Sequence, residues 1–205
     1  MTAERATHWD TVYRTKQIDE VSWFQTEPTR SMQLLTEATP CPTSVIDVGA
    51  GASVLLDSLL DAGIADVTVL DISEEALAAV RRRTAARSPA PSFVVADLLS
   101  WTPARHWDAW HDRAVFHFLT DPDDRASYVA TATRAVAPGG IAVVATFAPD
   151  GPEQCSGLPT VRYDAEQLAA AFGVGFDLER TEREVHRTPS GGEQPFTWVV
   201  LRRAP

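Results

Sequence analysis

The middle of the chain alternates between short apolar runs and amphipathic stretches. Residues 44–48 form an apolar run that predicts a strand, and a glycine turn follows at 49–51. An apolar helix is predicted over 54–62 and a second strand over 66–70. Because a strand, a crossover helix and a second strand form a parallel pair, this segment predicts a βαβ unit.

The same alternation continues to about residue 147. It predicts helices at 74–87 and 122–137, strands at 92–96, 109–112 and 141–147, and a helical stretch that includes 115–119. A helix at 164–172 then precedes two extended segments, 176–187 and 196–203, on either side of the turn-rich stretch 189–195. The pattern therefore predicts an α/β fold, with a parallel sheet covered by helices on both faces and extended by an antiparallel hairpin.

The region before the first strand has a different pattern. Two helices are predicted at 3–14 and 29–38, and the polar stretch between them, 15–28, has no periodicity but carries Trp23 and Phe24. We expect residues 1–40 to form a helical cap and lid, and residues 41–205 to form the main domain of a single structural unit.

Composition narrows the class of protein. The 205 residues are 44% hydrophobic and 22% charged, which suits one globular domain with a buried core. A formal net charge of −10 disfavours nucleic acid and anionic membranes as partners. The first ten residues contain no apolar signal region and the apolar runs are strand-sized, so a cytoplasmic location is expected.

The turn after the first predicted strand carries a candidate ligand site. In an open parallel sheet, ligands bind at the carboxyl ends of the strands. Gly49 and Gly51 permit a tight turn and the close approach of a ligand, while Ser53 and the following backbone N–H groups suit an anionic group. Asp71 ends the second strand 20 residues after Gly51, where a carboxylate accepts hydrogen bonds from ribose hydroxyls. The ligand is therefore expected to contain a ribose.

Further acids distinguish this turn from a dinucleotide site. The third glycine of the dinucleotide motif is replaced by Val54. Asp47 lies two residues before the first glycine, and Asp97 follows the third predicted strand. With the added hairpin, this set resembles the class I S-adenosylmethionine-dependent methyltransferases. The resemblance implies a Rossmann-like sheet of strand order 3-2-1-4-5-7-6, with strand 7 antiparallel, and S-adenosyl-L-methionine as cofactor.

The resemblance also implies roles for individual residues. Asp47 would orient the methionine amino group, the backbone of Gly49–Gly51 would lie under the cofactor, and Asp71 would hold the ribose. Asp97 and the Leu98 backbone would bind the adenine edge. The family often has a glycine where this chain has Ser53. The full set of cofactor-binding candidates is Tyr13, Trp23, Asp47, Gly49, Ala50, Gly51, Ser53, Asp71, Ile72, Asp97, Leu98 and Asp112.

A tighter resemblance rests on three short motifs. His8–Tyr13 contains a His-Trp-Asp-x-x-Tyr start, residues 22–25 are Ser-Trp-Phe-Gln, and residues 110–119 are Trp-His-Asp-Arg-Ala-Val-Phe-His-Phe-Leu. These motifs are similar to those of a bacterial group of small methyltransferases and, more distantly, to eukaryotic protein lysine methyltransferases. The acceptor does not carry over from this resemblance.

The end of the fourth predicted strand holds the catalytic candidates. His111 is predicted to accept a proton, because imidazole titrates near neutral pH, or to orient the acceptor. Asp112 is predicted to bind the methionine end of the cofactor or to pair with Arg113, and Arg113 to hold an anionic acceptor. His117 lies four residues after Arg113 and is predicted to face the same cleft. The structural alternative is a surface pair of Asp112 with Arg113 beside a buried His111.

Several other side chains have two open interpretations. Tyr13, Trp23 and Phe24 contact either the pocket or the core, whereas Trp9 is expected to pack in the core. Cys155 touches substrate or is an ordinary half-buried or exposed thiol. Cys41 and Cys155 are expected at opposite edges of the sheet, too far apart for a disulfide.

No metal is expected at this site. Metal-dependent O-methyltransferases of this fold resemble one another in an Asp-Asn pair after the fifth strand, where this chain has Thr146-Phe147. The histidines His106, His111 and His117 also lack the spacing that places two imidazoles on one helical face.

These features predict methyl transfer to a small-molecule acceptor by in-line displacement. The alternatives are a protein lysine methyltransferase, an NAD-dependent nucleotide-sugar oxidoreductase and a cofactor-binding protein without catalysis. The oxidoreductase lacks support, because the chain has no Tyr-x-x-x-Lys pair. Lys16 is the one lysine in the chain and lies outside the predicted sheet. The segment 15–28 is predicted to become ordered over the cofactor, and the oligomeric state is left open.

Overall fold

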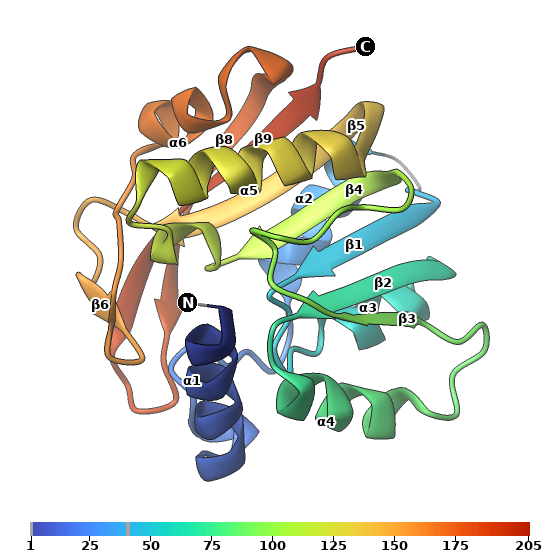
Figure 1. Ribbon diagram of the computed structural model, residues 1–205, viewed down its shortest axis with the longest axis vertical. Coiled ribbons are helices and arrows are strands. Elements are labelled where there is room, and N and C mark those ends of the chain that lie inside the picture. The colour runs from blue at the N-terminus through green and yellow to red at the C-terminus, as the bar shows by residue number, and fades with distance from the viewer. Residues whose placement is uncertain (1, 40–41) are drawn as a thin grey trace.

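A seven-stranded sheet runs through the middle of the molecule (Figure 1), in a computed structural model that describes residues 2–39 and 42–205. Its strands are β1 (Ser44–Val48), β2 (Asp66–Asp71), β3 (Ser92–Val95), β4 (Trp107–Arg113), β5 (Val136–Phe147), β8 (Phe176–Arg187) and β9 (Glu193–Arg203). The order is β3-β2-β1-β4-β5-β9-β8, with β1 to β5 parallel and β9 antiparallel to both neighbours. This confirms the predicted order 3-2-1-4-5-7-6, since β8 and β9 are the sixth and seventh strands of the main sheet.

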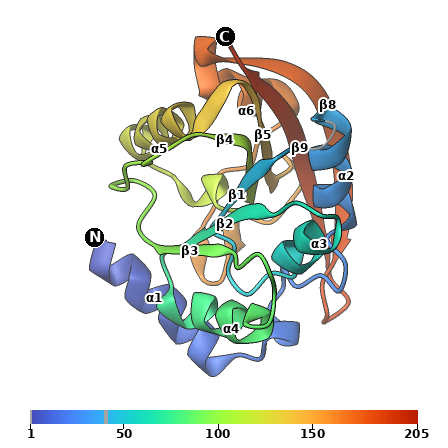
Figure 2. The same cartoon turned by 90° about the vertical axis from the view of Figure 1, so that its right-hand side faces the viewer.

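Helices cover both faces of the sheet (Figure 2). The helices are α1 (Thr2–Thr15), α2 (Thr29–Ala38), α3 (Leu55–Asp61), α4 (Glu74–Thr84), α5 (Pro122–Ala135) and α6 (Ala165–Phe172). Short 3₁₀ turns are η1 (Ile18–Glu20), η2 (Phe116–Phe118) and η3 (Gly173–Gly175), and a small hairpin pairs β6 (Gln154–Cys155) with β7 (Leu158–Pro159).

Two hydrophobic clusters hold these layers together. On one face, leucines of α2 and α3 pack with strand residues such as Val45 and Trp198. On the other face, Tyr128 of α5 and Phe172 of α6 pack with strand residues such as Trp110. The central strands β1 and β2 are buried along almost their whole length, as expected for a parallel sheet covered on both faces.

The segment after β4 differs from its prediction. The apolar stretch 115–119 forms only the 3₁₀ turn η2, and Ala114 before it has a φ of 74°. The carboxylate of Asp112 accepts hydrogen bonds from the backbone N–H groups of Val115, at 2.7 Å, and Phe116, at 3.0 Å. These bonds and the left-handed Ala114 bend the chain sharply where a longer helix would begin.

The N-terminal helices lie outside the sheet. In both views α1 lies beside α4 (Figures 1 and 2), where Asp10 accepts hydrogen bonds from the Ser73 hydroxyl, at 2.7 Å, and the Glu75 backbone, at 3.3 Å. The segment 15–28 crosses from α1 to α2, and its Ser22 carbonyl accepts a 2.8 Å bond from His186 of β8. These contacts attach the N-terminal region to both ends of the sheet.

Cys41 lies outside the described residues, so its predicted distance from Cys155 stays a prediction. Among the residues with described structure, no helix is long and apolar enough to cross a membrane.

Candidate active site

The turn after β1 depends on two glycines with positive φ, 57° at Gly49 and 56° at Gly51. A Cβ atom at Gly49 would lie 1.9 Å from Cγ2 of Val115, and one at Gly51 would lie 2.0 Å from the Tyr13 hydroxyl. Glycine is therefore required here both for the backbone conformation and for the close approach of Val115 and Tyr13.

Asp71 connects this turn to the end of β2. Its two carboxylate oxygens accept hydrogen bonds from the backbone N–H groups of Gly51, at 2.7 Å, and Ser73, at 2.8 Å. Burial raises the pKa of Asp71 to about 6, although the two N–H groups act in the opposite direction. Each oxygen retains a lone pair, and the side chain lines a cavity, so Asp71 can still accept bonds from a diol.

Asp97 offers a second acceptor on the same cavity. Its Oδ1 accepts a 3.0 Å bond from the Leu99 backbone, whereas Oδ2 is buried and has no hydrogen-bond partner in the described structure. Arg5 of α1 lies 3.6 Å from that oxygen and is held by a 2.6 Å bond to Asp124. A buried oxygen without a donor is suited to the amino group of a purine.

Two cavities meet at the carboxyl end of the sheet. The larger one, about 330 Å³, is lined by Asp71, Ile72, Asp97 and Leu98 at one end and by Arg113, Phe147, Cys155 and Phe196 at the other. The smaller one, about 60 Å³, is lined by Phe24, Ser31, Asp47, Ala50, Ser53 and His111. Tyr13, Trp23, Gly49 and Arg113 line both cavities and so form the partition between them.

The residues at this edge fit S-adenosylmethionine. Asp71 and the unpartnered Oδ2 of Asp97 lie on one cavity, at the positions expected to hold ribose and adenine. Asp47 and the backbone turn at Gly49 border the smaller cavity. The structure thus brings together the predicted cofactor residues other than Asp112, and their individual roles stay predictions.

His111 is buried within a hydrogen-bonded chain. Its Nδ1 lies 2.7 Å from Oδ1 of Asp47, and its Nε2 lies 2.9 Å from the hydroxyl of Ser31. Because a carboxylate only accepts, Nδ1 donates to Asp47 and Nε2 is left to Ser31. Neither ring nitrogen is free to take a proton from an acceptor, so the geometry favours an orienting role.

Ser31 is a residue of the site that the sequence patterns did not predict. It lies on α2 and is 2% exposed, on the same helix face as Leu34 and Leu35. A serine three and four residues before two buried leucines is the sequence signal that identifies a buried hydroxyl at this position.

The structure corrects the prediction for Asp112. Its carboxylate accepts a 2.5 Å bond from the Tyr128 hydroxyl in addition to the backbone bonds described above, and the side chain is fully buried. Burial raises the pKa of Asp112 to about 6, and the bond from Tyr128 opposes this effect. Alternation along β4 directs Asp112 away from His111 and Arg113, so in the described structure Asp112 does not pair with Arg113 and lines neither cavity.

Arg113 has an unusual environment for a cation. Its Nη1 donates to the Trp23 carbonyl at 3.1 Å, and its guanidinium carbon lies 4.8 Å from the centre of the Phe196 ring. Nε and Nη2 are buried and have no partner among the described residues. Burial lowers the pKa of Arg113 to about 10, so the side chain still carries its charge at neutral pH.

His117 does not line either cavity. Its ring packs against Phe118 and Phe147, each with a centroid distance of 4.5 Å. Burial, aided by the charge of Arg113, lowers the pKa of His117 to about 3. The prediction that His117 faces the cleft is therefore wrong, because the ring lines neither cavity and contacts Phe118 and Phe147, which do line the larger one.

The aromatic residues of the N-terminal region do line the site. Tyr13 and Trp23 border both cavities, and Phe24 borders the smaller one, which favours pocket contact over core packing alone. Burial raises the pKa of the Tyr13 hydroxyl, so it remains protonated. Trp9, expected in the core, packs against Trp23 and Phe118 but also lines the larger cavity.

Cys155 lies on the larger cavity and is 8% exposed. Burial raises the pKa of its thiol, which keeps it protonated and weakly nucleophilic. Within the ranges 2–39 and 42–205, no group of three or more histidine, cysteine, aspartate or glutamate residues is arranged to hold a metal ion.

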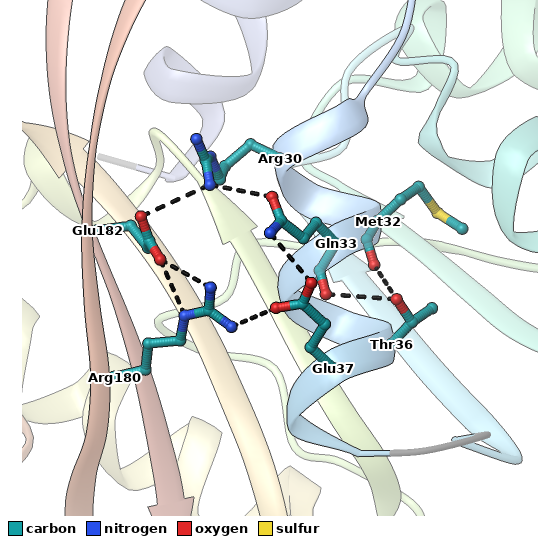
Figure 3. A network of polar contacts seen from close by, with 7 residues as sticks. All are labelled: Arg30, Met32, Gln33, Thr36, Glu37, Arg180 and Glu182. Atoms are coloured by element: carbon teal, nitrogen blue, oxygen red, sulfur yellow. Dashed lines mark hydrogen bonds and ion pairs between the residues drawn. The ribbon is translucent and has the colours of Figure 1, made fainter.

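A network of polar contacts fixes α2, and with it Ser31, against β8 (Figure 3). Arg30 lies 3.5 Å from Glu182, and Arg180 donates to Glu182 at 2.9 Å and also to Glu37. Gln33 joins Arg30 to Glu37 through two 3.0 Å bonds. The network holds the helix that supplies the partner of His111.

Comparison with known proteins agrees with this geometry. Residues 45–140 match the family model of a methyltransferase domain. No curated protein sequence matches the chain.

Solved structures share the fold over nearly the whole chain. N-methyltransferase NodS from Bradyrhizobium japonicum WM9, bound to S-adenosyl-L-homocysteine, has a TM-score of 0.73 and 14% identity, and the alignment covers 97% of this chain and 100% of NodS. The Burkholderia thailandensis 1,6-didemethyltoxoflavin-N1-methyltransferase has a TM-score of 0.72 and 19% identity, with coverage of 100% and 87%. A protein solved in work on conversion of a disulfide bond into a thioacetal group during echinomycin biosynthesis has a TM-score of 0.75 and 23% identity, with coverage of 97% and 93%.

Three observations point to the same class of enzyme. They are the order of the sheet, the acids near the ends of β1, β2 and β3, and the family match over residues 45–140. Residues 45–140 therefore form a methyltransferase domain, and the whole chain has the fold of the S-adenosylmethionine-dependent methyltransferases.

Proposed function

We propose that the methyl acceptor of this enzyme is a small molecule and that the reaction is an in-line displacement. The observation that carries the proposal is the segment 22–25, because Trp23 lines both cavities and Phe24 and Gln25 line the smaller one. Three contacts attach residues 22–25 there: the Ser22 carbonyl to His186, the Trp23 carbonyl to Arg113, and Gln25 to Glu184 at 3.4 Å. A compact molecule enclosed under this segment fits the cavity better than a side chain still attached to a folded protein.

The named neighbours support this choice. One of them is a 1,6-didemethyltoxoflavin-N1-methyltransferase crystallised with 1,6-didemethyltoxoflavin and S-adenosylhomocysteine. The likeness concerns the fold, so it supports a small acceptor as a class and no particular molecule.

The residues of the chain have distinct tasks in this proposal. When bound, S-adenosylmethionine supplies an electrophilic methyl group. Asp71 and Asp97 would hold its ribose and adenine, while Asp47, held by a hydrogen bond from His111, would face the methionine end. Trp23, Phe147 and Phe196 exclude water and align the acceptor, and such alignment supplies much of the rate in a displacement that needs no covalent help from the protein.

The alternatives make different demands on the chain. A protein lysine acceptor would require the cover formed by residues 22–25 to open widely enough to admit a polypeptide segment. A binding protein without catalysis would retain S-adenosylmethionine without forming product.

Release of S-adenosylhomocysteine tests the proposal. The wild-type enzyme is incubated with S-adenosylmethionine and either a panel of metabolites or a panel of folded and peptide lysine substrates. We expect release above background with one or more metabolites and not with the proteins. Release with proteins alone would favour the lysine alternative, and tight cofactor binding without release in either panel would favour the non-catalytic one.

A further inference from the structure

The guanidinium of Arg113 is placed as an anion-binding group, and no acid among the described residues forms a hydrogen bond or an ion pair with it. Its Nη1 is used by the Trp23 carbonyl, and the ring of Phe196 lies against the guanidinium. The remaining edge carries Nε and Nη2, which are both buried and have no hydrogen-bond partner in residues 2–39 and 42–205. These two N–H groups are parallel donors on one edge of the guanidinium, the arrangement that matches the two oxygens of a carboxylate.

The acid whose charge acts on Arg113 does not bond to this edge. Glu184 acts on Arg113 through its charge, but its carboxylate accepts bonds from the indole of Trp198, at 2.9 Å, and from Gln25, at 3.4 Å. No ion pair of Arg113 with an acid occurs among the described residues. A buried cation with two unused donors is costly, and a bound anion would remove that cost.

The surroundings of Arg113 limit what the anion is attached to. Trp23, Phe147, Leu158 and Phe196 line the larger cavity near Arg113, and the thiol of Cys155 adds a weakly polar surface. Such a lining favours an aromatic or aliphatic body over a sugar or a phosphate-rich ligand. Gln194 adds a neutral polar group on the same cavity.

We propose that the acceptor is a small organic carboxylate with an apolar body, and that its carboxylate binds side-on to Nε and Nη2 of Arg113. This inference rests on the proposed small-molecule methyl transfer and names the chemical class of the acceptor. Because Nη1 of the same side chain holds the Trp23 carbonyl, a carboxylate bound there also lies directly beneath the segment 22–25 that covers the cavity.

Matched acids and amides test the subsite without knowledge of the natural acceptor. The probes are benzoate with benzamide, indole-3-acetate with indole-3-acetamide, and hexanoate with hexanamide. Each is titrated calorimetrically into the protein with and without S-adenosylhomocysteine. We expect one or more acids to bind at least about tenfold more tightly than the matching amide, which corresponds to about one charge-assisted hydrogen bond.

Variants assign that preference to Arg113. In Arg113→Gln the acid preference should fall below about threefold, while the exposed control Arg187→Gln should retain it. Arg113→Lys keeps the charge and a donor for the Trp23 carbonyl but lacks the side-on pair, so an intermediate preference is expected. This variant also preserves the test if Arg113→Gln does not fold.

The two proposals fail in different ways. Equal binding of acids and amides to the wild-type protein, or an acid preference that survives in Arg113→Gln, overturns the carboxylate subsite. Two results count against the proposed function. One is that the wild-type protein does not bind S-adenosylhomocysteine, and the other is that it forms no S-adenosylhomocysteine from S-adenosylmethionine with any metabolite. The titrations without S-adenosylhomocysteine keep the first result readable if the second occurs.

Discussion

Replacement of Asp71 by alanine tests the ribose-binding edge of the site. In the structure its buried carboxylate borders the larger cavity and retains lone pairs after accepting from Gly51 and Ser73. A hydrogen bond to a charged group contributes roughly 1.5 to 3 kcal/mol. Loss of one such bond to the ribose should weaken binding of S-adenosylhomocysteine by about 10- to 150-fold, and loss of both by more.

The same substitution has two opposing effects on stability. The backbone N–H groups of Gly51 and Ser73 lose their acceptor, which costs about 1 to 3 kcal/mol for each group that finds no water. Against this, burial raises the pKa of Asp71 to about 6, so its ionisation costs roughly 3 kcal/mol more in the folded protein than in the unfolded chain, and the alanine variant is relieved of this cost at neutral pH. We therefore expect Asp71→Ala to fold, with a free energy of unfolding within a few kcal/mol of the wild-type value.

Calorimetric titration with S-adenosylhomocysteine measures the affinity, and thermal unfolding of the same samples shows that the variant is folded. Asp61→Ala is the matched control, because Asp61 is exposed on α3 and neither Asp61 nor its partner Arg87 lines either cavity. The control should bind like the wild-type protein. A folded Asp71→Ala variant whose dissociation constant lies within about twofold of wild type would refute the ribose assignment.

Three further predictions follow from the same geometry. Affinity for S-adenosylhomocysteine should fall as the pH drops through about 6, because protonation removes the charged acceptor at Asp71. Asp71→Ala should lack this change, and an affinity of the wild-type protein that does not vary with pH would contradict the assignment. Hydrogen exchange of residues 21–25 should slow when S-adenosylhomocysteine binds, and equal protection with and without it would argue against closure of this segment. Ser31→Ala should lower the free energy of unfolding, measured in urea titrations, by about 1 to 3 kcal/mol, because it leaves Nε2 of the buried His111 without its partner. An unchanged urea midpoint would mean that this hydrogen bond contributes nothing to stability.

The sheet and its ligand-binding edge follow from local sequence patterns. The strand, turn and helix signals around Gly49 and Gly51 are contiguous, and Asp71 and Asp97 each end or follow a strand of the same parallel sheet. Parallel strands bring their carboxyl ends to one edge, so the position of these acids in the sequence is enough to bring them together.

The fourth strand shows where such reasoning fails. Alternation already separates His111 and Arg113 from Asp112, but both faces of a parallel sheet are covered, so the sequence does not reveal which face holds the ligand. The role of Asp112 as a buried acceptor depends on Tyr128, a residue of a different element 16 positions later.

Contacts between distant segments account for the remaining differences. The partner of His111 is Ser31, 80 residues earlier, and the carbonyl bound by Arg113 belongs to Trp23, 90 residues earlier. No local periodicity encodes such pairs, because they depend on how the N-terminal region packs over the finished sheet.

The central claim is that the enzyme transfers the methyl group of S-adenosylmethionine to a small molecule. The most direct measurement uses S-adenosylmethionine labelled in the S-methyl group, incubated with the enzyme and a cell extract that is afterwards separated into small molecules and macromolecules. We expect the label in a new small-molecule product with the wild-type enzyme, and far less of it with Asp71→Ala at limiting cofactor. Label found only in the macromolecular fraction, or in neither fraction although the cofactor binds, would contradict the claim.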